Sequence, residues 1–258
     1  MGLNAKPWLT AHPIAHRGLH DAGRGVLENT LGAAERAAAR GFSIECDVQP
    51  SADGEAMVFH DDALDRLTLA SGPLRLKRAA EIKTIRLKAG AEAIPTLPEL
   101  LERVAGRVPI ICEIKSVFDG DMRLAQRVAE IAADYRGPLA LKSFDPAIIA
   151  HFRKHGRPPG PPDAPCPLGV VAVANYADPY WSALSVEQKR SLANFLHYSE
   201  TLPDFLSYCV DDLPNAVPFL LRALSGAPVM AWTVRTKAQR EAAAEWADQI
   251  VFEGALGA

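Results

Sequence analysis

The sequence contains no long uninterrupted run of apolar residues. None of its stretches has the length and composition of a membrane-spanning helix, and the first thirteen residues lack the apolar segment of a secretory signal peptide. A stable insertion into a membrane is therefore not expected. Without a targeting signal, the expected location is cytoplasmic.

Cysteine and net charge are also scarce. The four cysteines, Cys46, Cys112, Cys166 and Cys209, are widely separated and form no CxxC pair, so we expect free thiols without a functional role. The formal net charge of −3 argues against a nucleic-acid partner or an anionic membrane surface. A site for an anionic ligand must therefore concentrate its positive charge locally.

What the sequence does contain is a regular alternation of short apolar runs with alanine-rich helical stretches. Strands are expected at 13–18, 42–48, 56–60, 108–115, 139–144, 168–173, 205–210, 228–234 and 249–252. Helices are expected at 29–40, 97–107, 122–135, 146–155, 186–194, 213–224 and 237–246. The proline-rich segment 156–167 is expected to be a loop.

This alternation predicts the fold class. Strands that alternate with helices pair in parallel. About eight such units in 258 residues favour an α/β fold of the TIM type, a closed (β/α)₈ barrel. An open doubly wound sheet is the alternative, because periodicity alone does not show closure. No internal repeat or low-complexity linker divides the chain, so residues 1–258 are expected to form a single domain.

Charged residues interrupt four of the apolar segments, where an unpaired charge is costly to bury. The interruptions are His16-Arg17-Gly18, Glu45-Cys46-Asp47, His60-Asp61 and Glu113-Ile114-Lys115. Because side chains alternate along a strand, the two outer residues of the second and fourth groups share one face. At the C-terminal edge of a barrel, the polar side chains of different strands converge on one site.

The converging carboxylates indicate a metal site. Glu45, Asp47 and Glu113 would repel one another unless a cation lay between them. A hard divalent ion, Mg²⁺ or Ca²⁺, prefers such oxygen ligands. No cysteine lies at the converging positions, which argues against a structural zinc site.

The remaining interrupting residues fit proton transfer and anion binding. His16 and His60 flank the carboxylates and can serve as general acid and general base near neutral pH. Arg17 and Lys115 offer donors to phosphate oxygens, although Lys115 could equally act as a counter-ion to the carboxylates. Together these groups are the parts needed for metal-assisted cleavage of a phosphoester.

The same residues carry a family resemblance that extends from residue 13 to about residue 234. The chain resembles the glycerophosphodiester phosphodiesterases, whose ordered motifs are similar to His16-Arg17-Gly18, Glu28-Asn29-Thr30, Glu45-x-Asp47, His60-Asp61, Leu64-x-Arg66-x-Thr68, Pro95-Thr96-Leu97, Glu113-Ile114-Lys115, Ser143-Phe144 and Trp232-Thr233-Val234. Each motif alone is weak. Nine of them in register make chance a poor explanation.

The resemblance implies a TIM barrel with a small insertion after the second strand, here residues 62–93. It implies that Glu45, Asp47 and Glu113 bind one divalent metal ion, Mg²⁺ or Ca²⁺. His16 and His60 would be the general acid/base pair, in a hydrolysis of glycerophosphodiesters to glycerol 3-phosphate and an alcohol. The substrate would be a small molecule of lipid and glycerol metabolism, with its phosphate on Arg17 and Lys115.

Three segments depart from the family's pattern. Leu69-Ala70-Ser71-Gly72 replaces a turn that is usually similar to Asp-Gly-Thr-Gly. Arg235 stands where the family often has Asn, and Glu253 stands near a common Thr-Asp pair. We expect Arg235 and Glu253 at the mouth of the pocket and do not expect either to touch the metal and histidine set.

Several other residues have two interpretations. Glu28 either lies beside the site, as the resemblance implies, or is only a neighbour of a helix N-cap at Asn29 or Thr30. Phe144 and Trp232 are either core residues or an apolar pocket wall for the glycerol backbone. The other histidines are expected at the surface or at helix ends: His12, His20, His151, His155 and His197.

Two alternative functions are considered beside the phosphodiesterase. One is an enzyme similar to phospholipases C or D that acts on lipid head groups, and the other is a catalytically idle barrel that binds phosphodiesters. Within the favoured function, either water or the neighbouring glycerol hydroxyl can be the nucleophile, and the second route forms a cyclic phosphate first. Both routes use the same two histidines.

Overall fold

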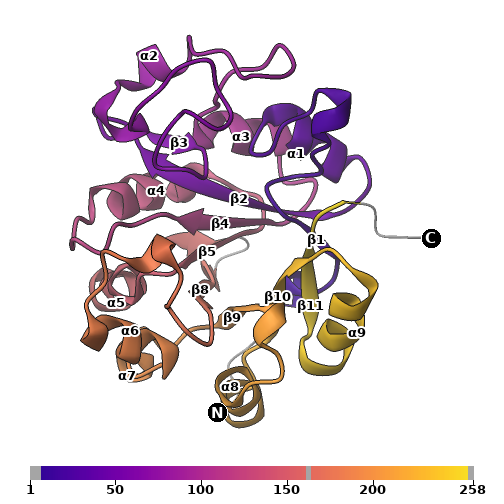
Figure 1. Cartoon of the computed structure of the whole chain (residues 1–258), viewed down its shortest axis with the longest axis vertical. Coiled ribbons are helices and arrows are strands. Elements are labelled where there is room, and N and C mark those ends of the chain that lie inside the picture. Colours follow the sequence, from indigo (N-terminus) through magenta and orange to yellow (C-terminus); the bar gives the residue numbers. More distant parts are fainter. Residues whose placement is uncertain (1–6, 161–163, 255–258) are drawn as a thin grey trace.

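The computed structural model describes residues 7–160 and 164–254. In these residues eight parallel strands surround a common axis, with helices outside them (Figure 1). They are β1 (Ile14–Ala15), β2 (Ser43–Pro50), β4 (Ile110–Ile114), β5 (Leu139–Ser143), β8 (Leu168–Ala172), β9 (Phe205–Cys209), β10 (Val229–Val234) and β11 (Gln249–Phe252). Because β1 pairs with both β2 and β11, the sheet closes. The expected TIM-type barrel is confirmed, and the doubly wound sheet is excluded.

The helices lie between successive strands, and all of the main ones except α4 begin at a side chain that caps them. The main ones are α1 (Leu31–Ala38), α3 (Leu97–Val104), α4 (Arg123–Asp134), α5 (Pro146–His155), α6 (Val186–Ala193), α8 (Ala216–Ser225) and α9 (Lys237–Trp246). Thr30 and Thr96 are typical caps, each accepting a hydrogen bond from a backbone N–H of the first turn. None of the helices in residues 7–160 and 164–254 is long and apolar enough to cross a membrane.

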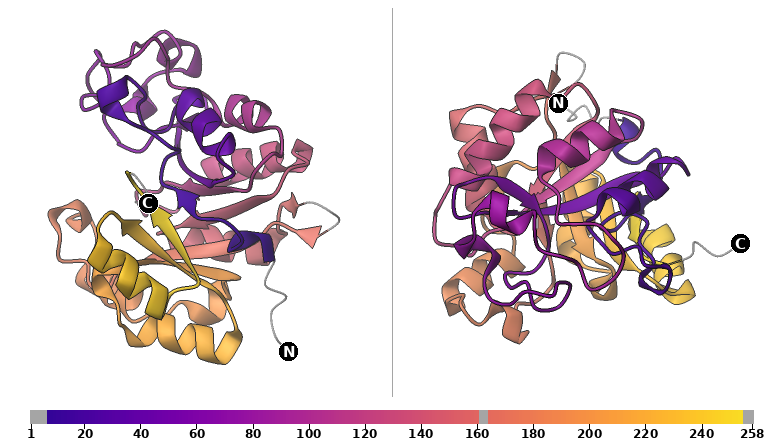
Figure 2. Two further views of the ribbon diagram at one scale, coloured as in Figure 1. Left: turned by 90° about the vertical axis from the view of Figure 1, so that its right-hand side faces the viewer. Right: turned by 90° about the horizontal axis from the view of Figure 1, so that it is seen from above.

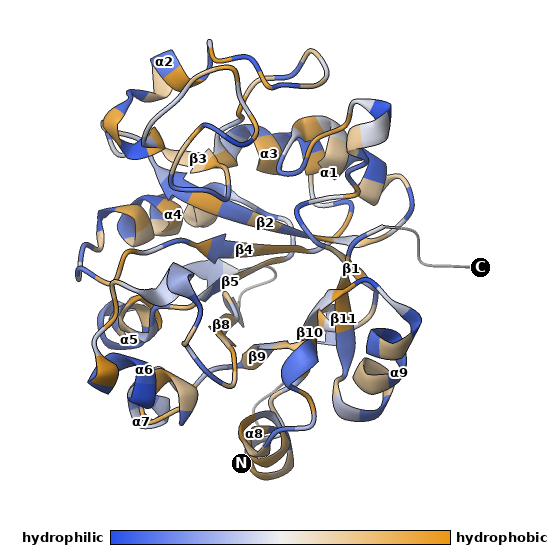
Figure 3. Ribbon diagram, in the orientation of Figure 1, coloured by the Kyte–Doolittle hydropathy of each residue, from blue (hydrophilic) through white to orange (hydrophobic). Residues whose placement is uncertain are grey.

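The barrel interior has an apolar lower layer beneath a charged upper layer. Phe205, Met230 and Val251 are fully buried in this lower layer, which Leu9 closes from below. Gly169 makes room for Phe205, since a Cβ at that glycine would lie 2.3 Å from the phenyl ring. Figure 3 shows β4 changing from hydrophobic along its shaft to hydrophilic at its arrowhead. The polar chemistry is thus confined to the C-terminal ends of the strands.

Residues between β3 (Ala56–Val58) and α3 form a separate layer above one side of the barrel (Figures 1 and 2). They contain a 3₁₀ turn (Leu74–Leu76) and the short helix α2 (Ala79–Ile82). Their apolar side chains pack on one another in a cluster distinct from the main core, in which Phe59, Leu64 and Ile82 are almost fully buried. This layer therefore has a small hydrophobic core of its own.

The structure corrects one expectation about local structure. The segment 156–167, expected as a loop, contains a short antiparallel pair, β6 (Pro159–Gly160) and β7 (Ala164–Pro165). Its prolines are tolerated because the adjoining hydrogen bond runs from the N–H of Cys166 to the carbonyl oxygen of Pro158. The strand expected at 56–60, as an extension of the second strand or a partner to it, is present as the partner β3, which pairs antiparallel with β2 and lies outside the barrel ring.

His197 lies at a helix end, which is one of the two positions expected for it. It precedes the short helix α7 (Tyr198–Thr201), but it is buried, and burial lowers its pKa to about 4. The four cysteines are free thiols, as expected. Residues 1–6, on which part of the leader prediction depends, lie outside the described residues.

Candidate active site

A cavity of about 210 Å³ opens at the C-terminal ends of the barrel strands. Its lining residues come from strands or strand ends all around the barrel: His16, Arg17, Asp47, His60, Glu113, Lys115, Lys142, Phe144, Val171, Cys209, Asp211, Trp232, Thr233 and Arg235. This edge is where enzymes of this fold place their chemistry. The four charged groups identified from the sequence therefore meet at one place, as expected.

Three carboxylates form the centre of the charged layer. Glu45, Asp47 and Glu113 are buried, and one oxygen of each lies within 4.8 Å of one oxygen of the others. Cys46, between the first two, points instead into the core outside the barrel. The period-two prediction is therefore confirmed, and these three side chains could hold a metal ion.

Two lysines neutralise the carboxylates. Lys115 Nζ donates a hydrogen bond to Glu113 Oε1 at 2.6 Å and lies 2.9 Å from Asp47 Oδ1. Lys142 Nζ lies 3.0 Å from Glu45 Oε1 and 3.3 Å from Glu113 Oε2. Burial alone would lower the pKa of each lysine, but the adjacent carboxylates raise it above its ordinary value. Both lysines are therefore cationic at neutral pH.

The sequence analysis missed Lys142. It lies within the otherwise apolar run Leu139–Ser143, so it breaks a strand in the same way as the four groups that were recognised. Its side chain is almost fully buried. Applying the criterion of a charge inside an apolar strand to every strand would have found this residue.

Arg17 closes the cluster on the side of β1. Its backbone is left-handed, with φ of 57°, and its N–H donates to Glu45 Oε2 at 3.1 Å. Its Nε lies 3.3 Å from Asp47 Oδ2, while a terminal nitrogen donates to Glu28 Oε1 at 2.6 Å. The next residue must be small, because a Cβ on Gly18 would lie 2.8 Å from the backbone of Ala33.

Two of the three carboxylates, those of Asp47 and Glu113, are held in their charged form. Burial alone would raise the pKa of Asp47, but Lys115, His60 and Arg17 lower it well below the ordinary value. The pKa of Glu113 is lowered in the same way, against burial, by Lys115 and Lys142. Asn29 adds a hydrogen bond of 2.9 Å from its Nδ2 to Asp47 Oδ2. The donor set is thus anionic oxygen, which suits a hard cation.

His16 follows β1 and contacts a carboxylate that was not expected there. Its Nδ1 lies 2.5 Å from Glu253 Oε1, and its Nε2 lies 3.8 Å from Glu45 Oε2. Glu253 also accepts a hydrogen bond of 2.7 Å from Arg235 Nε. The expectation that Arg235 and Glu253 stay clear of the histidines is therefore wrong for Glu253. The contact forms because β1 and β11 are neighbours in the closed sheet.

His60 lies on the opposite side of the cluster, just after β3. Its Nδ1 lies 2.8 Å from Asp61 Oδ1. Asp61 accepts a second hydrogen bond, of 2.6 Å, from Arg66 Nε. Burial alone would raise the pKa of Asp61, but His60 and Arg66 lower it well below its ordinary value. Asp61 therefore orients His60.

Three residues with two interpretations, Glu28, Phe144 and Trp232, make contacts at the rim of the site. Thr30 caps α1, while Glu28 accepts hydrogen bonds from Arg17 and Arg66 at the edge of the site. Phe144 and Trp232 both line the cavity and pack edge to face, with ring centroids 5.6 Å apart. They therefore form an apolar wall beside the charged layer.

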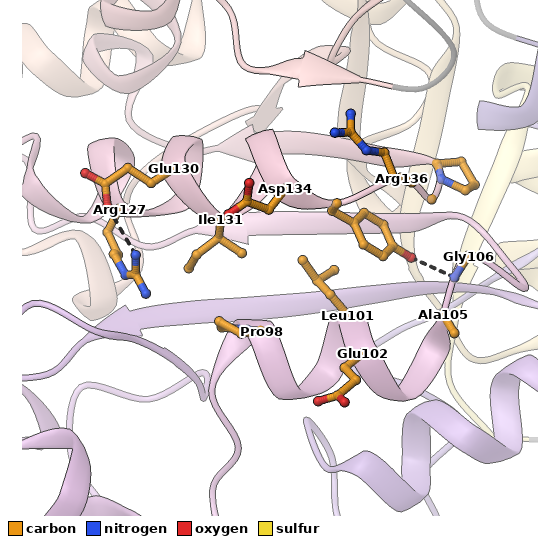
Figure 4. Close-up of a pocket in the computed structure, with 13 residues that line it drawn as sticks. Pro98, Leu101, Glu102, Ala105, Gly106, Arg127, Glu130, Ile131, Asp134 and Arg136 are labelled. Carbon is orange, nitrogen blue, oxygen red and sulfur yellow. Dashed lines mark hydrogen bonds and ion pairs between the residues drawn. The ribbon is translucent and has the colours of Figure 1, made fainter.

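A larger groove of about 820 Å³ lies on the outside of the barrel between α3 and α4 (Figure 4). Leu101 and Ile131 face it, and the Gly106 N–H donates to the Tyr135 hydroxyl at one end. Arg127 in this groove is already paired with Glu130 and Glu55. The smaller cavity, where two histidines meet three carboxylates, is therefore the better candidate for an active site.

Comparison with known proteins identifies the family and supports the fold. A family model described as the glycerophosphoryl diester phosphodiesterase family matches residues 16–255. A glycerophosphodiester phosphodiesterase of Caldanaerobacter subterraneus subsp. tengcongensis is 28% identical over 243 residues, which span 88% of this chain and 87% of that protein.

Solved structures agree on the fold. A phosphodiesterase of Oleispira antarctica, in complex with the product sn-glycerol-3-phosphate, has a TM-score of 0.72 at 22% identity, covering 94% of this chain and 92% of the other. Glycerophosphodiester phosphodiesterase of Thermotoga maritima has a TM-score of 0.68 at 23% identity, covering 93% and 94%. Since the family model spans nearly the whole sequence, the chain belongs to the glycerophosphoryl diester phosphodiesterase family.

Proposed function

We propose that this protein hydrolyses glycerophosphodiesters to glycerol 3-phosphate and an alcohol. The observation that carries the proposal is one cavity at the C-terminal edge of the barrel, which two histidines and four cationic side chains line beside a cluster of three buried carboxylates. Membership of the family supports the general reaction. The bound product in the Oleispira antarctica structure supports a small-molecule substrate.

Glu45, Asp47 and Glu113 are the proposed ligands of one divalent metal ion, Mg²⁺ or Ca²⁺. Their oxygen atoms and their short mutual distances suit a hard cation. The charges of the carboxylates are at present balanced by Arg17, Lys115 and Lys142, so a divalent ion makes the cluster net positive. Such an ion supplies charge stabilisation to the phosphate oxygens of the substrate.

His16 and His60 are the proposed proton-transfer pair. Each has Nδ1 on a carboxylate, which leaves Nε2 for the reacting groups. One imidazole accepts the proton of the nucleophile as its bond to phosphorus forms. The other donates a proton to the alcohol oxygen as the bond between that oxygen and phosphorus breaks.

The remaining side chains are assigned to substrate binding. Arg17 and Lys115 are the proposed phosphate contacts, because both combine a cationic side chain with a place on the cavity wall. Phe144 and Trp232 form the proposed wall for the glycerol backbone. We further propose that residues 62–93 are an insertion in the single barrel domain, and that Arg66 in it tightens the rim through Glu28.

The test is product analysis with purified protein and Mg²⁺ or Ca²⁺. Glycerophosphocholine, glycerophosphoethanolamine and glycerophosphoglycerol are offered side by side with intact phospholipid, and ³¹P NMR follows glycerol 3-phosphate and any cyclic phosphate. Release of glycerol 3-phosphate, strongly slowed in His16→Ala and retained in His155→Ala, is the expected result. His155 is a matched control because it is exposed at the end of α5.

Two outcomes contradict the proposal. Cleavage of intact phospholipid alone indicates an enzyme similar to phospholipases C or D. Absence of any product from all substrates, with metal binding intact, indicates a barrel that only binds phosphodiesters.

A further inference from the structure

We propose that Glu253, itself held by Arg235, is a positioning residue that fixes the ring orientation and the tautomer of His16. The role of His16 in proton transfer rests on the proposed function, but the contact with Glu253 does not. The structure assigns Nδ1 of His16 to Glu253 and Nε2 to the cavity.

Both partners are fixed by the backbone at the seam where the barrel closes. The N–H of His16 donates to the carbonyl oxygen of Phe252 at 2.9 Å, and the N–H of Glu253 donates to that of Val234 at 3.1 Å. The ends of β1, β10 and β11 thus hold the two residues side by side. The short distance of 2.5 Å between His16 Nδ1 and Glu253 Oε1 follows from this backbone arrangement.

The identity of the donor follows from the chemistry of the pair. An ionised carboxylate can only accept hydrogen bonds, so Nδ1 of His16 carries the proton. Burial alone would raise the pKa of Glu253, but the hydrogen bonds from His16 and Arg235 lower it well below its ordinary value. In the neutral ring Nε2 is then unprotonated, and it lies 3.8 Å from Glu45 Oε2 at the carboxylate cluster.

Arg235 keeps the Glu253 carboxylate in place from the solvent side. Its Nε donates to Glu253 Oε2 at 2.7 Å, and its backbone N–H donates to Gln239 Oε1 at 2.8 Å. Gln239 belongs to the first turn of α9 and also donates to Asp211 Oδ1. Glu253 is thus connected to a regular helix through Arg235, although the guanidinium is half-exposed.

Two of the three departures from the motifs of the resemblance, Arg235 and Glu253, thus contact each other. We infer that Arg235 and Glu253 act together to position His16. A glutamate at the end of β11 has one more rotatable bond than an aspartate, and the hydrogen bond from Arg235 restricts that added freedom.

Glu253→Gln is the principal test, because it keeps the size of the side chain and removes its charge. We expect kcat to fall by about 10–100-fold, below the full effect of losing a general acid or base, with KM changed by less than about twofold. In a double-variant cycle, adding Glu253→Gln to His16→Ala should lower kcat by less than about twofold. An additive effect in that background, or an unchanged kcat in the single variant, overturns the proposal.

A second readout does not depend on activity. In protein labelled with ¹⁵N at histidine, wild type is expected to show His16 with a protonated Nδ1, and Glu253→Gln is expected to lose that preference. Spectra are taken with and without Mg²⁺ or Ca²⁺. If wild type hydrolyses none of the diesters, the proposed function fails, while this spectrum still tests the contact. An unchanged tautomer in Glu253→Gln contradicts the inference.

Two further sets of variants separate positioning from folding. Arg235→Ala should lower kcat several-fold, and Arg235→Lys should lower it less, because a cation near Glu253 is retained. Glu35→Gln is the matched control, since Glu35 accepts two hydrogen bonds from Arg107 on the outer surface. It should lose only a surface pair and leave kcat unchanged. If Glu35→Gln lowers kcat as much as Glu253→Gln, the positioning role is wrong.

Discussion

Each of the two histidines in the cavity contacts a carboxylate that in turn accepts a hydrogen bond from an arginine. The two arrangements are similar, but they arise in different ways. His16 meets Glu253, which lies 237 positions away in the sequence, and Arg235 follows. His60 meets the adjacent residue Asp61, and Arg66 follows. The first arrangement exists only when the barrel is closed, whereas the second is built within one segment. The same hydrogen-bond pattern can therefore be supplied by global topology or by local sequence.

The two arrangements also differ in how they connect to the carboxylate cluster. Arg66 donates to Glu28, which accepts from Arg17, and Arg17 lies 3.3 Å from Asp47. On the other side, Arg235 connects to α9 and not to the cluster. The side chain of His60 is 23% exposed and that of His16 is 10% exposed, so the local arrangement is the more open to solvent.

The largest expected effect is shared by both histidines. His16→Ala and His60→Ala should each lower kcat for glycerophosphocholine by about 10²–10⁴-fold, because each removes a proton-transfer group. Binding of Mg²⁺ or Ca²⁺, followed by calorimetry, should persist in both. If one variant keeps wild-type kcat, the two arrangements are not functionally equivalent.

The next effect tests the cluster between the two histidines. Glu45→Gln should raise the metal concentration needed for half-maximal activity by at least about 10-fold, since one charged ligand is lost. Activity is titrated with Mg²⁺ and with Ca²⁺ in parallel for wild type and variant. An unchanged metal requirement contradicts the ligand role of Glu45.

A smaller effect on kcat is expected for Arg66→Ala, which alters the arrangement around His60. Arg66 is 46% exposed, so its pairs with Asp61 and Glu28 are screened, and kcat should fall by only about two- to fivefold. The difference from wild type should shrink further in high salt. Steady-state rates at low and high KCl measure it. A fall in kcat as large as that of His60→Ala would mean that the arrangement of His60 and Asp61 depends on Arg66.

The smallest effect is on stability against pH. The pKa values of Asp61 and Glu253 are lowered in the folded protein, so each carboxylate stabilises the fold at neutral pH and loses this contribution as the pH falls below about 4. Asp61→Asn and Glu253→Gln should lower Tm at pH 7 by roughly 2–4 °C. The difference in Tm between wild type and each variant should shrink on acidification, as thermal scans from pH 8 to pH 3 can show. A difference that stays constant would contradict these pKa directions.

The sequence predicted those features that follow from regular geometry. Strand periodicity predicted that Glu45 and Asp47 share a face, and the barrel edge brought Glu113 beside them. The boundaries of α5 and β11 were predicted to the residue. These outcomes depend on repeating backbone geometry. Such geometry produces a periodic pattern of residue types that a short stretch of sequence already shows.

What the sequence did not predict depends on side-chain direction at strand ends. Glu253 follows the last strand, where alternation no longer determines the face, so its contact with His16 required the closed ring. The pair β6 and β7 was too short to produce a periodic signal. Lys142 is a different case, because its signal was present but was not used.

The contacts of His16 with Phe252 and Glu253 also determine the order in which parts of the site form during synthesis. During synthesis, both histidines and all three carboxylates are in the chain long before β11 is made. His16 receives its partner only when Phe252 and Glu253 dock against β1. A nascent chain thus contains the three carboxylates early, but the contact of His16 with Glu253 forms only when the barrel closes, so that completing the fold and completing this part of the cavity are one event.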